Sequence, residues 1–305
     1  MKSLQYTAYG VRPVVADIPK PSPGPGEVLI RVSGAALNPL DVKIGAGQVH
    51  DYFPIAFPSV VGTDLAGTIE RMGPGVAGRK VGDAVLARTD PASGGALAEY
   101  AVVPVSSLVA APGAVPLPAA AGLATAAATA WQVVFEVADV QPGRTLLVHG
   151  GAGGVGGFVV QFARRAGARV VTTASSAGAA LAGKLGAHEV IDYTTTDFRT
   201  IVPHVDVVVD PVGGATEAAS LDVLGPGGLL IALNVPPNAE RAAARGIRAE
   251  FLFHTSDADR LAKVAAAADE GLEIVVDRTV PLEDAAAAFD HLAQGHAKGK
   301  VIVRP

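Results

Sequence analysis

The sequence contains no cysteine. This absence excludes disulfide bonds, thiolate metal sites, iron–sulfur clusters and cysteine nucleophiles. Charge is also scarce: 17% of the 305 residues are charged, with 24 Lys and Arg against 29 Asp and Glu and a net charge of −5. Because a polyanion is bound through a surplus of basic side chains, we expect no nucleic-acid partner.

Long apolar runs are missing as well. The nearest candidate, residues 110–130, is interrupted by prolines and threonines, and residues 1–10 lack the apolar core of a secretory signal. We therefore expect a cytoplasmic protein that does not bind membranes. Half of the residues are hydrophobic, which is enough for a large buried core, and the length predicts two domains.

The pattern changes along the chain. Up to about residue 108, short β-like runs such as 28–32, 65–71 and 84–87 alternate with Gly and Pro clusters, which predicts a small barrel or irregular sheet. From residue 119 on, strand-like and helical segments alternate, which predicts an α/β fold with a doubly wound parallel sheet. The expected strands are 145–148, 169–173, 189–191, 205–210, 229–233 and 248–253, and the expected helices are 119–137, 157–166, 176–185, 216–224 and 238–245. Beyond a helix at 257–271, we expect short strands around 282–284, another helix and a last strand at 300–303.

A glycine-rich stretch follows the first of these parallel strands and leads directly into a helix. Gly151, Gly153 and Gly156 form a GxGxxG pattern. In this context the glycines allow a tight turn, close approach of a pyrophosphate and close packing of helix on strand, with the helix N-terminus directed at the anion. The predicted dinucleotide contacts here are Gly151, Ala152, Gly153, Gly154, Val155 and Gly156.

The end of the next strand bears on the choice of dinucleotide. An NAD site needs an acidic side chain near this point for the ribose 2′-hydroxyl, but the chain reads Ala174-Ser175-Ser176. Two hydroxyls and no carboxylate favour a 2′-phosphate, so we predict NADP(H). A serine cap for the following helix is a competing and compatible explanation.

Several stretches resemble the medium-chain dehydrogenase/reductase superfamily, and within it the zinc-independent, zeta-crystallin-like quinone oxidoreductases. They are NPLD at 38–41, GTDLAG at 62–67, VGDAV at 81–85, the glycine turn, VDPVGG at 209–214 and GHAKGK at 295–300. The resemblance implies a GroES-like catalytic domain at 1–118, an NADP-binding Rossmann domain at 119–254, and a segment at 255–305 that returns to the catalytic domain. It also implies a homodimer paired through the strand at 248–253, because an exposed strand edge can pair with a second copy.

The chain departs from the zinc-dependent members of this superfamily. Asn38 stands where they carry a catalytic cysteine, and Thr63-Asp64 where they carry a His-Glu pair. Because tetrahedral zinc prefers sulfur and nitrogen donors, we expect no bound metal. None of the seven histidines has a metal-ligand spacing, and His149, just before the glycine turn, is expected to be structural.

The resemblance suggests further contacts for the cofactor. Relatives often hold the 2′-phosphate with a lysine at a position that matches Gly178. Lys184 either replaces that lysine or is a solvated charge. Tyr193 matches a position near the adenosine, against the alternative of a half-buried tyrosine at a strand end; Thr129 matches one near the nicotinamide ribose, against simple helix packing. Asn234 is also assigned to the cofactor site.

Without zinc, a conjugated acceptor is the easier substrate, because hydride transfer to an enone or quinone places charge on a delocalised oxygen that ordinary donors can hold. We predict Asn38 at that oxygen or at the nicotinamide ribose, with Asp41 orienting its surroundings and Lys43 or Tyr52 donating a hydrogen bond or proton. The expected function is NADPH-dependent reduction of quinones or α,β-unsaturated carbonyls. Two alternatives stay open: a dinucleotide-holding binding or stress protein with little turnover, and an NADP-dependent alcohol dehydrogenase.

Overall fold

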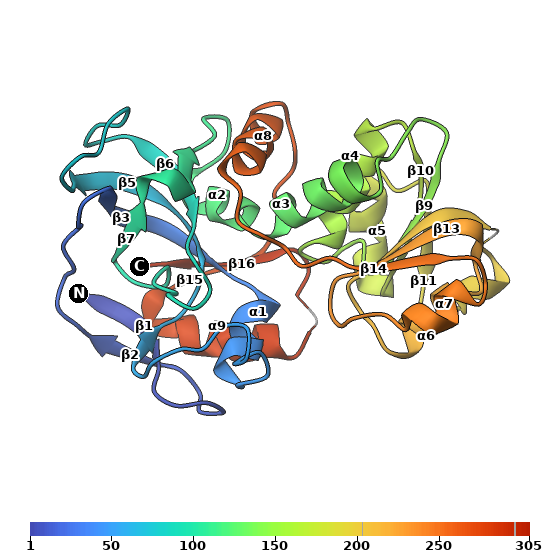
Figure 1. Ribbon diagram of the computed structural model, residues 1–305, viewed down its shortest axis with the longest axis horizontal. Coiled ribbons are helices and arrows are strands. Elements are labelled where there is room, and N and C mark those ends of the chain that lie inside the picture. Colours follow the sequence, from blue (N-terminus) through green and yellow to red (C-terminus); the bar gives the residue numbers. More distant parts are fainter. Residues whose placement is uncertain (203, 296) are drawn as a thin grey trace. The chain divides into compact units, whose positions relative to one another are not determined.

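Figure 1 shows the computed structural model, which describes residues 1–202, 204–295 and 297–305. The chain divides into two compact units. The first unit comprises Met1–Ala128 and Ser256–Pro305, and the second comprises Thr129–Thr255. Residues 119–128, expected in the nucleotide-binding part, lie in the first unit because α2 (Leu117–Ala120) and η2 (Ala121–Leu123) pack against strands β3 and β5 of that unit.

The first unit is rich in antiparallel strands. Its larger sheet has the strand order β15-β16-β3-β5-β6-β8, with β7 also paired to β3, and its smaller sheet has the order β2-β1-β4. The C-terminal strand β16 pairs antiparallel with β3, so the end of the chain completes the sheet that begins near its start. The bounds are β1 Lys2–Tyr6, β2 Val14–Asp17, β3 Glu27–Leu37, β4 Ser59–Val60, β5 Asp64–Met72, β6 Ala84–Arg88, β7 Tyr100–Pro104, β8 Leu108–Ala110, β15 Val276–Pro281 and β16 Lys300–Arg304.

Short helices close this unit. They are α1 (Pro39–Gly45), η1 (Val105–Ser107), α8 (Ala258–Asp269), η5 (Leu282–Asp284) and α9 (Ala285–Ala293). Gly34 shows why α2 can lie so close to β3, since a Cβ atom at this position would meet the Pro118 carbonyl oxygen at 2.5 Å. The apolar side chains of β3, among them Val28 and Ile30, are fully buried, and this burial is the main force that holds the sheet together.

The second unit is a parallel sheet flanked by helices. Its strand order β11-β10-β9-β12-β13-β14 is the doubly wound arrangement in which the order reverses between β9 and β12. In such sheets a ligand binds at the carboxyl ends of the strands beside that switch point. The strands are β9 Thr145–Val148, β10 Arg169–Ala174, β11 Glu189–Asp192, β12 Val205–Asp210, β13 Leu224–Ala232 and β14 Arg248–Phe251, and the helices are η3 Gln132–Val137, α4 Gly156–Arg165, α5 Ser176–Lys184, η4 Phe198–Thr200, α6 Ala215–Ser220 and α7 Ala239–Ala243. The boundary between the two units falls within a further helix, α3 (Ala126–Trp131).

The structure corrects two expected elements. The single helix expected at 119–137 is broken into α2, η2 and α3 and ends in the wider π-helical turn η3. The aromatic rings of Trp131 and Phe135 there pack on Phe162 of α4, with ring centroids 5.4 and 5.7 Å from it. Residues 282–284 form the 3₁₀-helix η5 rather than a strand, because Leu282 turns its buried side chain into the core just ahead of α9.

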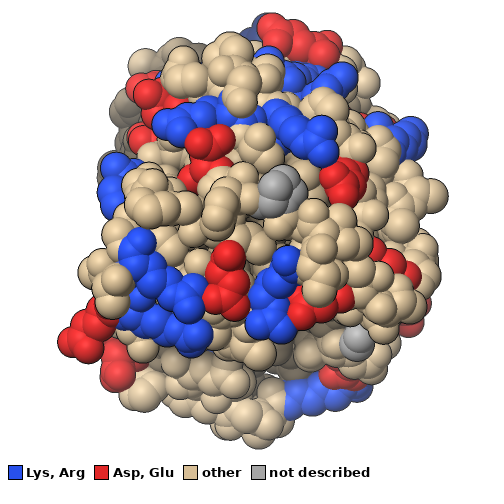
Figure 2. Space-filling model, turned by 90° about the vertical axis from the view of Figure 1, so that its right-hand side faces the viewer, with Lys and Arg blue, Asp and Glu red and all other residues tan. Residues whose placement is uncertain are grey.

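The face of the molecule shown in Figure 2 has no large patch of a single charge sign. In Figure 2, Lys and Arg side chains are interspersed with Asp and Glu on the face shown. No single helix among the described residues is long and apolar enough to cross a membrane. Two consecutive helical segments, Leu117–Leu123 and Ala126–Val137, are together long and apolar enough, but they are bent by 41° at the break between them. The absence of a nucleic-acid partner stays a prediction.

Candidate active site

The glycine turn joins β9 to α4 in the second unit. A Cβ atom on Gly151 would lie 2.1 Å from the Thr172 hydroxyl oxygen, and one on Gly156 would lie 2.2 Å from the Gly150 carbonyl oxygen. These two positions therefore need glycine for the turn itself. Gly153 differs, because within 4 Å its Cβ would meet only the Gly150 carbonyl oxygen, at 3.1 Å. The open side of Gly153 leaves space for a ligand to approach the backbone.

The N-terminus of α4 has the features of an anion-binding site. Val155 occupies the N-cap position and provides no side-chain cap. The first N–H groups of a helix lack intrahelical partners and carry a partial positive charge. Together with the half-exposed Gly153 and Gly154, this arrangement fits the pyrophosphate of a dinucleotide.

His149 directly precedes the glycine turn. Its ring is buried and is hydrogen bonded through Nδ1 to the Thr173 hydroxyl at 3.1 Å and through Nε2 to the Ser220 hydroxyl at 2.9 Å. Burial lowers the pKa of His149 to about 4, so the imidazole is neutral near pH 7. With both nitrogens committed to the protein, His149 fits a structural link between β10 and α6.

The end of β10 is where the sequence predicts the adenosine ribose. Ser175 is the N-cap residue of α5 and makes no side-chain cap hydrogen bond. Ser176 donates its hydroxyl to the carboxylate of Asp192, which is the last residue of the neighbouring strand β11. The sequence reading found no acid after β10, but the fold brings one from the strand beside it.

Two further positions around α5 explain a departure from the family pattern. A Cβ atom on Gly178 would lie 2.8 Å from the Cβ of Ala152 in the glycine turn, so this helix packs too closely on the turn for a lysine, the residue that the family resemblance implies here. Lys184 is the last residue of α5, about 12 Å along the helix axis from Ser176. The structure does not bring Lys184 to the two serines.

The remaining predicted cofactor residues have separate surroundings. Tyr193 follows β11 and is 55% exposed, while Thr129 is buried in α3. Asn234 follows β13 and donates from Nδ2 to the Val212 carbonyl oxygen at 2.7 Å, which joins the loops after β12 and β13. Asn234 and Tyr193 therefore lie at the carboxyl edge of the sheet, the edge that also carries the glycine turn.

A buried polar cluster lies in the first unit around Asn38. The Asn38 side chain accepts from Lys300 Nζ at 2.5 Å and donates to the Asp64 carboxylate at 3.0 Å. Asp64 also accepts from the Thr63 hydroxyl at 2.8 Å and from the Thr125 backbone and hydroxyl groups at 2.9 and 2.6 Å. The amide of Asn38 is therefore already engaged by protein groups, and its predicted role at a substrate oxygen stays a prediction.

Two more charges complete this cluster. Arg88 donates to the Thr125 hydroxyl at 2.8 Å and to the Ser256 hydroxyl at 2.5 Å. Asp41 accepts from the backbone N–H of Asn38 at 2.7 Å in a capping box that starts α1. Two buried carboxylates and two buried basic side chains thus occupy one region, and a buried charge needs such partners to be tolerated.

Burial perturbs the ionisable groups of the cluster. It raises the pKa of Asp41 to about 7, an effect to which the nearby Asp64 carboxylate adds and which Lys300 and Arg88 oppose. Burial also lowers the pKa of Lys300, although Asp64 and Asp41 act in the opposite direction. The cluster therefore gains or loses a proton near neutral pH at Asp41.

The other two predicted catalytic residues stand differently. Lys43 is on α1, partly buried, and burial lowers the pKa of its amine. Tyr52 lies in the loop after α1 and is 72% exposed. The catalytic roles of both residues stay predictions.

Sequence reasoning missed Asp64, Arg88, Thr125 and Lys300 as members of a site. Asp64 and Lys300 stand within stretches that carry the family resemblance, and Lys300 comes directly before the apolar run Val301-Ile302-Val303. A charged residue at the start of a buried strand is the signal that was available, since such residues are rarely buried without a partner. His296, in the same stretch, lies outside the described residues.

The cluster does not fit a catalytic zinc ion. Asp64 already accepts from four donor groups, and Asn38 and Thr63 are poor zinc ligands beside it. Across the described parts of the chain, no three His, Cys, Asp or Glu side chains are grouped as a metal site requires. We derive no chemistry through a metal.

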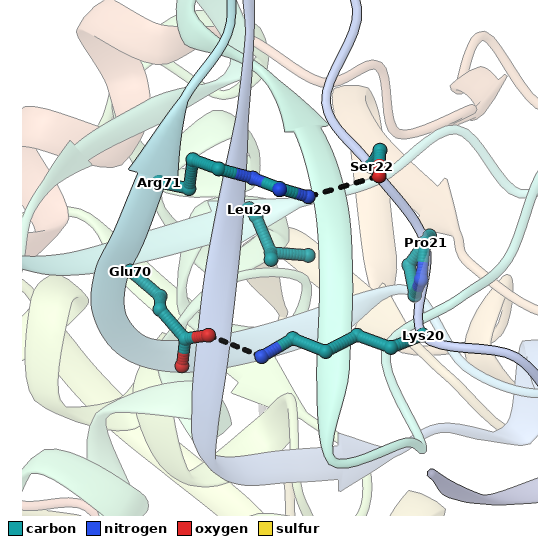
Figure 3. Close-up of a pocket in the computed structure, with 6 residues that line it drawn as sticks. All are labelled: Lys20, Pro21, Ser22, Leu29, Glu70 and Arg71. Atoms are coloured by element: carbon teal, nitrogen blue, oxygen red, sulfur yellow. Dashed lines mark hydrogen bonds and ion pairs between the residues drawn. The ribbon is translucent and has the colours of Figure 1, made fainter.

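A surface pocket of about 360 Å³ lies elsewhere in the first unit, lined by Lys20, Pro21, Ser22, Leu29, Glu70 and Arg71. Figure 3 shows the Lys20–Glu70 ion pair and the bond from Arg71 to the Ser22 hydroxyl across it. Leu29 pairs with Arg71 near one end of the β3–β5 ladder, and Ala36 pairs with Asp64 at the other, so the pocket is about 20 Å along the strands from the cluster. It contains none of the predicted site residues.

Comparisons with known proteins agree with this architecture. Residues 24–113 match the alcohol dehydrogenase GroES-like domain, and residues 185–303 match the zinc-binding dehydrogenase family. A chloroplast envelope quinone oxidoreductase homolog of Arabidopsis thaliana is 32% identical over 100% of this chain and 98% of its own. A chloroplastic NADPH-dependent alkenal/one oxidoreductase of the same plant is 34% identical over 100% of this chain and 80% of its own. The structure of a mycobacterial protein complexed with NADPH superposes with a TM-score of 0.90 and 32% identity, covering 100% of both chains.

Proposed function

Because the chain belongs to the medium-chain dehydrogenase/reductase superfamily, alongside quinone oxidoreductases and alkenal reductases, we propose that it reduces quinones or α,β-unsaturated carbonyls with NADPH. The observation that carries this proposal is the glycine turn, where Gly153 is open and the N-terminus of α4 has no side-chain cap. The relatives' NADPH dependence and the NADPH complex support the cofactor. Ser175, whose hydroxyl makes no cap hydrogen bond, supports it independently of the comparisons.

The residues of the second unit bind and orient the dinucleotide in this proposal. Backbone N–H groups of residues 151–156 hold the pyrophosphate, and the free hydroxyl of Ser175 donates to the 2′-phosphate. Tyr193 covers the adenosine, and Thr129 and Asn234 contact the nicotinamide half. The bound cofactor supplies the hydride, and the protein supplies orientation and polarity.

The acceptor gains one hydride and one proton overall. In an enone the hydride forms a C–H bond at the β-carbon while the C=C bond breaks, and the enolate takes a proton at the α-carbon or oxygen. A donor at the oxygen holds the charge that develops there. We assign this donor role to Lys43 or Tyr52, because both amide hydrogens of Asn38 point to protein acceptors, Asp64 and Ala36. Asn38 and Asp41 then act as positioning residues at the start of α1.

We propose that this chemistry needs no zinc, although the family matched by residues 185–303 is described as zinc-binding. Two observations support this assignment: the Asp64 carboxylate already accepts hydrogen bonds from four protein groups, and the sequence has no cysteine. Elemental analysis of the purified protein tests it. One zinc per chain, together with loss of turnover after chelation, would favour the alcohol dehydrogenase alternative.

Turnover tests the function directly. We expect NADPH to be oxidised in the presence of simple quinones or enones, and to bind at least about tenfold more tightly than NADH, equivalent to about 1.4 kcal/mol. Tight NADPH binding without turnover on any such acceptor would instead favour the dinucleotide-holding protein. Equal dissociation constants for the two dinucleotides would reject the assignment to NADPH. The cytoplasmic location stays a prediction, since both plant relatives carry chloroplast names.

We also propose a homodimer paired through β14, the last strand of the described parallel sheet. Phe251 at the end of this strand is 38% exposed, and the unpaired N–H and C=O groups along the edge of a sheet favour pairing with a second copy. Leu252 is not the residue for a proline test, because its N–H donates inward to the Ala232 carbonyl oxygen at 3.0 Å. Because the N–H groups of successive residues in a strand point to opposite sides, the N–H of Phe251 points away from β13, toward the open edge of the sheet.

Phe251→Pro therefore removes an edge donor without breaking the β13–β14 ladder. Light scattering of the wild type should give about twice 30.6 kDa, and the variant should shift toward the monomer. A wild type that is monomeric at micromolar concentration would contradict the dimer but not the enzymatic proposal.

A further inference from the structure

Asp192 brings a carboxylate to the place where the dinucleotides differ. It is the last residue of β11 and pairs in register with Ala174, the last residue of β10. Its carboxylate accepts from the Ser176 hydroxyl, from the backbone N–H of Thr194 at 2.9 Å and from the Thr194 hydroxyl at 2.6 Å. These bonds, that of Ser176 first, lower the pKa of Asp192, so the group is charged near pH 7.

The fold determines which part of a bound dinucleotide this carboxylate would face. In parallel dinucleotide-binding sheets, the acid that recognises a ribose 2′-hydroxyl follows the second strand, which is β10 here. Neighbouring strands are about 4.8 Å apart. Asp192 therefore presents its carboxylate one strand away from that point, and it engages a serine that follows β10.

The bond to Ser176 also changes what that serine can offer. A hydroxyl has one hydrogen, and in the structure that hydrogen points to Asp192. Ser176 is then left with acceptor lone pairs, which a phosphate cannot use. Ser175, with no side-chain cap bond, keeps its hydrogen for the ligand.

We propose that Asp192 is a specificity-determining residue that limits the preference for NADPH over NADH. This inference rests on the proposed dinucleotide site. The carboxylate repels a 2′-phosphate and withholds the Ser176 hydrogen from it, whereas the free 2′-hydroxyl of NADH can donate to the carboxylate. The enzyme consequently binds both dinucleotides, and Ser175 sets a preference for NADPH that Asp192 restrains.

Asp192→Asn tests this inference by binding rather than by turnover. The amide keeps the size and one acceptor oxygen but removes the charge. We expect the dissociation constant for NADPH to fall roughly tenfold, from Coulomb repulsion between charges a few ångströms apart in a water-like medium, and that for NADH to stay unchanged or rise. The change should shrink at high salt, because exposed charges are screened.

Two controls separate charge at this point from general effects. Glu189→Gln removes one charge at the other end of β11, where Glu189 pairs with Arg169 at 3.0 Å, and should leave the NADPH-to-NADH ratio unchanged. Asp192→Glu keeps the charge and should keep the wild-type ratio. Thermal melting of each variant verifies that the unit is folded.

The outcomes are distinct. If Asp192→Asn changes both dissociation constants by the same factor, or leaves the ratio within about twofold of the wild type, the inference is wrong while the proposed function stands. If Glu189→Gln raises the ratio as much as Asp192→Asn does, net charge is responsible and Asp192 has no special role. If the wild type binds neither dinucleotide, the proposed function and this inference both fail.

Discussion

Replacing Lys300 with methionine tests whether the buried cluster of the first unit is held together by charge. Methionine has a similar length and fills most of the same space, so the main change is the loss of an ammonium group. Lys300 Nζ donates to Asn38 Oδ1 at 2.5 Å and to the Leu37 carbonyl oxygen at 3.3 Å. The variant leaves these two acceptors without that donor and leaves Asp64 and Asp41 with Arg88 as their remaining cation in the cluster.

The size of the effect follows from these losses. Removing one partner of a buried charge set costs about 3–5 kcal/mol, and a buried acceptor left without a donor accounts for about 1–3 kcal/mol of such a loss. We expect the free energy of unfolding to fall by about 4 kcal/mol, which corresponds to roughly 10 °C in Tm for a domain of this size. Urea unfolding and calorimetry measure both quantities.

Lys298 supplies a matched control, because it is exposed and only two residues away. Lys298→Met should change the free energy of unfolding by no more than about 0.5 kcal/mol. If Lys300→Met is equally neutral, the ammonium group does not compensate the carboxylates, and the electrostatic account of the cluster is refuted. Lys300→Arg should restore part of the loss, since it returns the charge to a site that is tight for its larger head group.

Three further outcomes are expected. Gly153→Val should abolish NADPH binding in titrations while Tm changes little, whereas Gly156→Val should destabilise the second unit, since its Cβ would lie 2.2 Å from the Gly150 carbonyl oxygen; retained affinity in Gly153→Val would remove the turn from the site. Ser175→Asp should reverse or erase the preference for NADPH, because a carboxylate repels the 2′-phosphate; an unchanged preference would move the phosphate elsewhere. Burial raises the pKa of Asp41 from its ordinary 3.8 to about 7, so its stabilising contribution is present below about pH 4 and is lost as pH rises through about 7. Relative to Asp41→Asn, the free energy of unfolding of the wild type should fall by up to about 4 kcal/mol over that window. Parallel plots of the free energy of unfolding against pH for the two proteins would contradict the raised pKa.

The part of the site that is contiguous in the sequence could be predicted, whereas the part assembled from distant segments could not. The glycine turn is one contiguous stretch between a strand and a helix, so its spacing could be read directly, and the steric roles of Gly151 and Gly156 agree with that reading. The alternation of strands and helices likewise predicted the parallel sheet. The helix at 119–137 was wrong because alanine-rich periodicity does not reveal where a helix must bend or widen to pack its aromatic residues.

The buried cluster could not be predicted in the same way. Its side chains come from α1, β5, β6, β16 and the segment before α3, and only the pairing of β16 with β3 brings Lys300 beside Asn38. Nothing local distinguishes Lys300 from a solvated lysine until that register is known. The sequence therefore identified Asn38 as polar and predicted it at a substrate oxygen or at the nicotinamide ribose, but it could not reveal the bonds of its amide to Lys300 and Asp64.

Asp192 shows how a correct local rule leads to an incomplete conclusion. The rule that an NAD site carries an acid after its second strand concerns a single position along the chain. The chain reads Ala174-Ser175-Ser176 there and has no acid, so the rule predicts NADP(H). A phosphate, however, responds to every charge within a few ångströms, whichever strand supplies it. Because β11 is parallel to β10 and ends level with it, Asp192 lies beside Ser176 although it is 16 residues further along the chain. Both side chains would face the same part of the ligand. In our proposal, the preference between NADPH and NADH therefore depends on the ends of both β10 and β11, and not on the residues after β10 alone.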